Sequence, residues 1–90
     1  MADVIVTLKI MPESTSADLK KIEMLAKKKI EKLGSIGKTE ILPVAFGLKA
    51  INIVFIMDEK KGDTEKLEKE IELIEGVGSV EVTDVRRAIG

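Results

Sequence analysis

The sequence predicts an α+β fold in which a four-stranded antiparallel sheet carries two helices on one face. Alternating apolar and polar residues, which indicate strands, open and close the chain, and two stretches with apolar residues three and four apart, which indicate helices, lie between them. The predicted order is strand, helix, strand, strand, helix, strand. That order is typical of the ferredoxin-like β-α-β-β-α-β sandwich.

The first half of the chain contains one strand and one helix. Residues 3–11 alternate as a half-buried strand does, and Pro12 ends the strand. The helix continues to about residue 33, and Gly34 is a natural stop. The hydroxyls of residues 14–16 can cap it, with Asp18 in its first turn. Its apolar positions recur at helical spacing: Leu19, Ile22, Leu25, Ala26, Ile30 and Leu33.

The second half contains three strands and one helix. Residues 36–44 and 48–57 are expected as strands, and Asn52 interrupts the second of these as it would if one face were less well covered. After a polar connection, Asp63 or Thr64 can cap a helix that ends near Gly76. Its core positions are Leu67, Ile71 and Ile74. The last strand covers residues 77–85, and residues 86–90 are expected as a tail.

Length and composition exclude several classes of protein. The 90 residues suffice for one domain, predicted as 1–90. The absence of cysteine and histidine excludes disulfides, thiolate metal sites and catalysis through an imidazole. Fifteen basic residues against sixteen acidic ones give no net positive field to attract nucleic acid or an acidic membrane. Without a membrane-length apolar run or a secretory signal pattern, the chain is expected in the cytoplasm.

Polar clusters do not predict a catalytic, metal or cofactor site. The acidic side chains of the second helix are spread around a solvated face, and Asp58, Glu59 and Asp63 lack the spacing of a calcium loop. Phe55 is the one aromatic inside an expected strand, which argues against RNA bases stacking on the sheet. Six lysines of the first helix form either a solvated face or a docking surface for an acidic partner: Lys20, Lys21, Lys27, Lys28, Lys29 and Lys32.

The most informative aromatic residue is Phe46, which precedes Gly47 at an expected strand junction. Taken alone, this position favours a ring that closes the end of the core. The alternative is a ring that enters a pocket of a partner.

The segment around Phe46 resembles a family. Residues 43–49 read Pro-Val-Ala-Phe-Gly-Leu-Lys, which is similar to the Pro-Val-Gly-aromatic-Gly-aliphatic-Lys segment of the guanine nucleotide exchange domain of elongation factor 1-beta. Residues 4–12 and 79–82 resemble that domain's opening and closing strands. The length of the chain resembles the archaeal form.

The resemblance implies a translation factor that promotes exchange of GDP for GTP on elongation factor 1-alpha, without bond chemistry of its own. It implies that Phe46 wedges into the GTPase and that Gly47 and Lys49 contact it. The family carries a lysine near its end, and continuing the register places Arg87 there, beside Arg86. This chain departs from the family at Ala45, where glycine is usual, at Ala50, where a second lysine is common, and in the three residues after Arg87.

Two other functions remain open. A small-ligand-sensing module of the same fold would bind an effector at the loops between strands and helices, although residues 11–15 lack the usual glycine. An interaction domain without any effect on exchange would bind the GTPase and leave the rate of nucleotide release unchanged.

Overall fold

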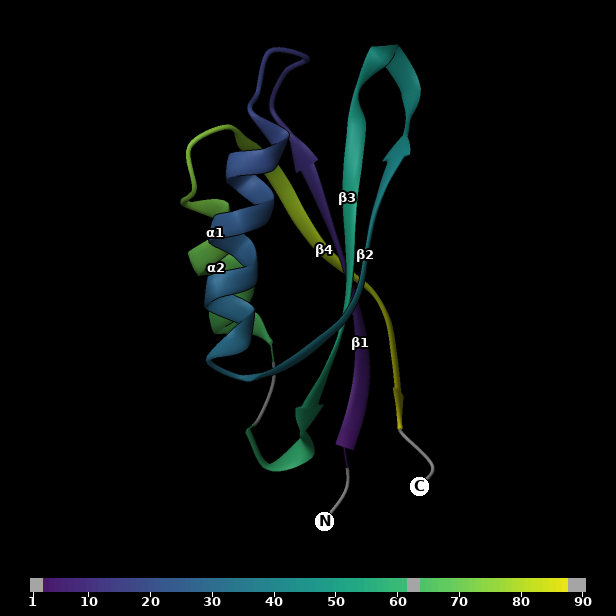
Figure 1. The fold of residues 1–90 in the computed structure, drawn as a ribbon, viewed down its shortest axis with the longest axis vertical. Coiled ribbons are helices and arrows are strands. Elements are labelled where there is room, and N and C mark those ends of the chain that lie inside the picture. The colour runs from purple at the N-terminus through teal and green to yellow at the C-terminus, as the bar shows by residue number, and fades with distance from the viewer. Residues whose placement is uncertain (1–2, 62–63, 88–90) are drawn as a thin grey trace.

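The computed structural model describes residues 3–61 and 64–87, and within them the predicted order of elements is confirmed. Two helices lie on one face of an antiparallel sheet, as Figure 1 shows: α1 (Leu19–Glu31) and α2 (Glu65–Glu72). The strands of the sheet, in the spatial order β2-β3-β1-β4, are β1 (Asp3–Pro12), β2 (Gly34–Pro43), β3 (Lys49–Asp58) and β4 (Val77–Arg87). This is the predicted ferredoxin-like α+β arrangement.

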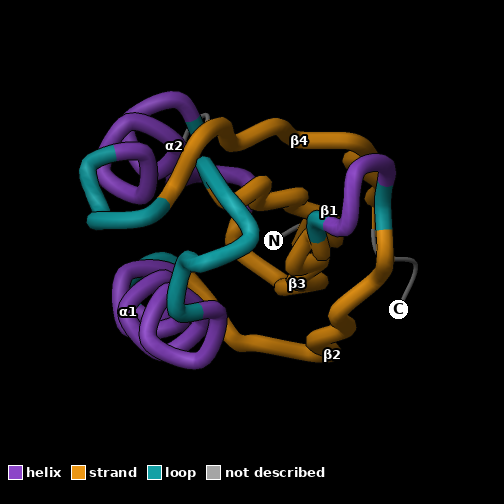
Figure 2. The backbone as a smooth tube through the Cα atoms, turned by 90° about the horizontal axis from the view of Figure 1, so that it is seen from above, coloured by secondary structure: helices purple, strands orange, loops and turns teal. Residues whose placement is uncertain are grey.

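The core fills the space between the helices and the sheet. The two central strands, β1 and β3, contribute alternate residues, so that Phe55 is fully buried among aliphatic side chains. The helices contribute the apolar positions that their spacing predicted. The buried helical residues are Ile22, Ala26, Ile30, Leu67 and Ile71, and Ile74 follows α2 into the same core. Figure 2 shows both helices on the same side of the sheet.

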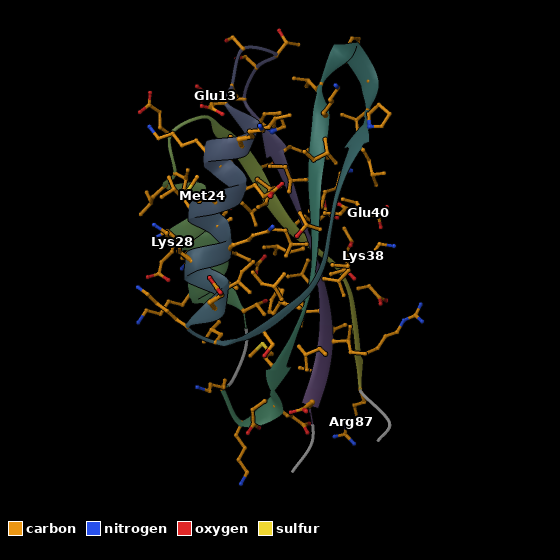
Figure 3. All side chains as sticks on the ribbon, in the orientation of Figure 1. Glu13, Met24, Lys28, Lys38, Glu40 and Arg87 are labelled. Atoms are coloured by element: carbon orange, nitrogen blue, oxygen red, sulfur yellow. The ribbon has the colours of Figure 1, made fainter. Side chains whose placement is uncertain are left out.

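The other face of the sheet has no helix over it. Asn52, Val54 and Ile56 of β3 alternate with the core residues, and so they lie on this face. The carboxamide Oδ1 of Asn52 is buried and accepts no hydrogen bond from the described residues. Lys38 and Glu40 of β2 form an ion pair of 3.1 Å on the same side (Figure 3). The unequal coverage that Asn52 predicted is therefore present.

The start and end of α1 differ from the prediction. Asp18 is the N-cap and not a first-turn residue, because its backbone is extended and its Oδ1 accepts a hydrogen bond of 3.2 Å from the backbone N of Lys21. The helix ends at Glu31, and Gly34 opens β2 instead of stopping the helix. A Cβ at Gly34 would overlap with the carbonyl oxygen of Ile56, so glycine is needed there for close pairing with β3.

Thr64 is the N-cap of α2, without a side-chain bond to the helix backbone. Its Oγ1 instead donates a hydrogen bond of 3.0 Å to the Oε2 of Glu68. The alternative cap, Asp63, lies outside the described residues. The helix ends at Glu72, four residues before the predicted exit at Gly76. Gly76 has a φ of +96°, in the left-handed region, and lies in the turn between α2 and β4.

The tail expected after residue 85 is wrong for its first two residues. Arg86 and Arg87 continue β4 and pair with Ile5 and Val4 of β1. One edge of β1 pairs with β3, and the other edge is available to β4 as far as Val4. Pairing there gives the backbone N–H and C=O groups of residues 86 and 87 partners within the sheet, which a tail would lack. Residues 88–90 lie outside the described part. Among the described residues, no helix combines the length and the apolar character needed to cross a membrane.

Candidate functional site

The hairpin that joins β2 to β3 carries the segment singled out by the sequence. Its last strand pair is Pro43 with Lys49. Inside that pair, the backbone N of Val44 donates a 2.8 Å hydrogen bond to the carbonyl of Leu48, and the N of Leu48 donates a 3.3 Å bond to the carbonyl of Ala45. These bonds close a short turn, Ala45–Gly47, at the tip. In Figure 1 this tip is the upper end of the molecule.

Phe46 projects from the tip into solvent. It is 94% exposed, so the prediction that its ring closes the end of the core is wrong. The physical reason is the position of the turn, which lies beyond the last strand pair and beyond the cover of the helices (Figure 1). Phe46 also has φ +61° and ψ +30°, the left-handed conformation that aromatic residues rarely adopt. An exposed ring in a strained backbone contributes little to the fold.

Gly47 and Lys49 lie where the hairpin faces the loop that follows β1. Gly47 has a φ of +75°, and a Cβ there would lie 3.7 Å from the Cγ2 of Thr15. A hollow of about 280 Å³ lies between the two loops, and one of its lining residues, Gly47, directly follows Phe46 in the chain. Its lining residues come from the two loops and from the adjoining ends of β1, α1 and β3: Pro12, Ser14, Thr15, Ala17, Leu19, Gly47 and Lys49.

The two arginines lie at the end of β4. The Nε of Arg86 is 2.8 Å from the Oδ2 of Asp84, and a nitrogen of the Arg87 guanidinium is 2.9 Å from the Oε1 of Glu59. Arg87 keeps 74% of its side chain exposed. Because neighbouring residues of a strand point to opposite faces, Arg86 lies on the open face of the sheet with its partner Ile5, and Arg87 does not.

The structure does not bring the predicted site residues together. Arg87 pairs with Val4 at one end of β1, whereas the hairpin tip lies beyond the end at which Pro12 is found. The strand between Val4 and Pro12 spans about 26 Å at about 3.3 Å per residue. Figures 1 and 3, which share one orientation, show the hairpin at the top and Arg87 at the bottom. The candidate site therefore has two separate parts.

The sequence interpretation did not identify the loop beside the hairpin as part of the site. Ser14 and Thr15 were considered only as helix caps or as an effector loop. The pairing of Ile10 with Ile51 brings the end of β1 next to the start of β3, and this long-range register places Thr15 beside Gly47. Within residues 3–61 and 64–87, no group of three or more acidic side chains could hold a metal ion.

Comparison with known proteins identifies the family. The profile of the EF-1 guanine nucleotide exchange domain matches residues 5–88. Elongation factor 1-beta of Thermoplasma acidophilum is 44% identical over 94% of this chain and 97% of its own. The proteins of the same name from Methanothermobacter thermautotrophicus and Methanococcoides burtonii are 40% and 38% identical, over 97% and 99% of this chain and 98% and 100% of theirs. The resemblance carried by residues 43–49 is thus confirmed, and the chain belongs to the EF-1 guanine nucleotide exchange domain family, with the archaeal elongation factor 1-beta proteins.

Proposed function

We propose that this protein promotes exchange of GDP for GTP on elongation factor 1-alpha and so regenerates the GTP form that carries aminoacyl-tRNA to the ribosome. The observation that carries the proposal is the match of residues 5–88 to the exchange domain. Residues 1–90 act as one exchange domain, in the cytoplasm, without contact to nucleic acid or membrane. The protein changes the affinity of its partner for a nucleotide and breaks no covalent bond.

The exchange activity requires a difference between two affinities. The protein must bind the nucleotide-free GTPase more tightly than the nucleotide-bound form, and by reciprocity the nucleotide is then bound less tightly in the complex. Each tenfold weakening of nucleotide binding requires about 1.4 kcal/mol of this difference. The contacts that we propose for it lie at both ends of the sheet.

The first contact in this proposal is the Phe46 ring, which enters a pocket of the GTPase. Full burial of a phenylalanine side chain is worth about 1.5–3 kcal/mol, and 94% exposure leaves nearly all of that gain for the complex. The hydrogen bonds of Leu48 with Val44 and with Ala45 hold the tip in one conformation, so little ordering is needed on binding. Gly47 and Lys49 contact the partner beside the ring.

The second contact is the end of β4. Arg87 is a cation whose guanidinium is held by one exposed carboxylate, Glu59, and such pairs exchange readily with solvent or a new partner. At the GTPase, Arg87 competes electrostatically with the magnesium ion or contacts a phosphate, with Arg86 beside it. A guanidinium is wider than the ammonium that the family usually carries, so this contact contributes less than Phe46 does.

The direct test is release of a fluorescent GDP analogue from elongation factor 1-alpha of the same organism, chased with excess GTP. At substoichiometric amounts, this protein is expected to accelerate release with repeated turnover. An unchanged release rate despite binding would instead identify an interaction domain without exchange activity. If neither binding nor release were affected, thermal stabilisation by a small metabolite would favour the ligand-sensing module.

A further inference from the structure

A continuous groove runs between α1 and α2, on the helical side of the molecule. It consists of two adjoining hollows of about 350 and 500 Å³ that share Lys29 and Glu70. Figure 2 shows the two helices side by side on one side of the sheet, and the proposed exchange contacts lie on other elements, the hairpin and β4. The residues that line the groove are therefore not used by the proposed exchange contacts.

The charge along the groove is predominantly positive. Five lysines line it, against two glutamates, Glu70 and Glu75. None of the five forms an ion pair with a described residue, whereas Lys27, outside the groove, pairs with Glu23 at 3.0 Å. The five are Lys21, Lys29, Lys32, Lys61 and Lys66. In a protein with a net charge of −1, this concentration of unneutralised lysines is local and attracts a negatively charged partner.

The groove is also apolar along its length. Leu73 is 85% exposed, although it follows directly on α2 and is flanked by the buried Ile74. Leu25 and Leu33 of the α1 side, which are half-buried, continue the apolar surface between the lysines. A patch that combines leucines with lysines favours a ligand that has both apolar and acidic groups.

The chemistry of the walls further restricts the ligand. None of the residues that line the groove belongs to a strand, so an extended peptide would find no strand edge with which to pair. A helical ligand forms its backbone hydrogen bonds internally, so it can bind such a surface without burying unpaired backbone N–H and C=O groups. The groove residues include no aromatic side chain on which a nucleic-acid base could stack.

We propose that the groove between α1 and α2 binds an acidic amphipathic helix of another protein. The leucines of that helix pack on Leu73, Leu25 and Leu33, and its carboxylates face the lysines. Of the two interpretations of the lysines of the first helix, this proposal adopts the docking surface for Lys21, Lys29 and Lys32. Such docking would hold the protein near a second component while the hairpin and β4 remain free.

The test uses a synthetic, fluorescein-labelled helical peptide with leucines at positions i, i+3, i+4 and i+7 and glutamates at most other positions. Binding is measured by fluorescence anisotropy without any GTPase, so the outcome is independent of the exchange assay. We expect Lys29→Glu combined with Lys66→Glu to weaken binding about tenfold or more, since each reversal turns an attraction into a repulsion. The control, Lys20→Glu with Lys69→Glu, makes the same change of charge on the same helices outside the groove.

A second pair of variants tests the apolar contact. Leu73→Ser is expected to weaken binding several-fold, and Met24→Ser, which removes a 56% exposed apolar side chain outside the groove, is expected not to. Because both residues are exposed, neither change disturbs the core. The proposal would be overturned by equal losses in both members of either pair, by equal binding of a scrambled peptide of the same composition, or by complete displacement of the peptide by single-stranded RNA.

Discussion

Replacement of Phe46 by asparagine separates what the ring does for binding from what it does for the fold. An L-residue in the left-handed region costs about 1–2 kcal/mol, and asparagine tolerates this region better than phenylalanine does. Since Phe46 is 94% exposed, loss of the ring removes burial of only about 10 Å², or about 0.3 kcal/mol. The free energy of unfolding should therefore rise by about 0.5–1 kcal/mol.

The same substitution should severely reduce exchange. If the ring is buried in the complex, its loss removes about 1.5–3 kcal/mol of partner affinity, which corresponds to about a 10- to 150-fold decrease in the efficiency of exchange. The control is Phe46→Ala, which loses the ring but keeps most of the backbone strain. Both variants should lose exchange, and the asparagine variant should unfold at a Tm about 2–6 °C higher than the wild type.

The measurements are thermal unfolding followed by circular dichroism and release of a fluorescent GDP analogue from elongation factor 1-alpha. A folded Phe46→Asn variant that exchanges at the wild-type rate would refute the role of the ring. A variant that is less stable than the wild type by about 1 kcal/mol or more would refute the argument from backbone strain.

Three further changes test the two-part site and the fold. Arg87→Ala should reduce exchange less than Phe46→Ala does in the same release assay, and a larger loss of exchange would contradict this ranking. It should lower the free energy of unfolding by about 0.2–1 kcal/mol at most, because the ion pair of Arg87 with Glu59 is exposed. Gly34→Ala should destabilise the sheet by more than about 3 kcal/mol in urea unfolding, because its Cβ overlaps with the carbonyl of Ile56, and unchanged stability would contradict the close pairing of β2 with β3. Asp18→Ala should cost about 1 kcal/mol in the same unfolding measurement, and Asp18→Asn, which also caps helices, should cost less.

Local pattern sufficed to predict the elements of the fold but not their ends. Apolar spacing identified the core positions of both helices, because burial requires one face of each helix to be apolar. Helix and strand ends depend on tertiary contacts that local pattern does not contain. Gly34 is of the residue type that commonly ends a helix, yet it begins β2, where only a glycine can approach the carbonyl of Ile56 so closely. Local pattern predicted Arg86 as a tail residue, but in the structure it pairs with Ile5 at the edge of β1.

The sequence predicts which residues form the candidate site, and this stays a prediction, but it does not predict their arrangement. Residues 43–49 identified Phe46, Gly47 and Lys49 through their resemblance to the family. Sequence separation gave no indication that Arg87 lies at the far end of the sheet from them, since that follows from the antiparallel pairing of β1 with β4. The position of Phe46 taken alone favoured burial, because an isolated aromatic residue is more often buried than not. Only the resemblance, which implies a ring that enters a partner, indicated the exposure that the structure shows.

The spacing of the two proposed contacts is a property of the sheet, and it would allow a short chain to reach two points on a partner. β1 pairs with β3, which leads into the hairpin, and with β4, which ends in Arg87. Phe46 and Arg87 are thus held by ladders on both sides of one strand, and the separation between them, about 26 Å or more, does not depend on a flexible linker. When one contact forms, the other is already positioned, and the second association costs little ordering free energy. The fold therefore contributes to the proposed exchange by fixing a distance.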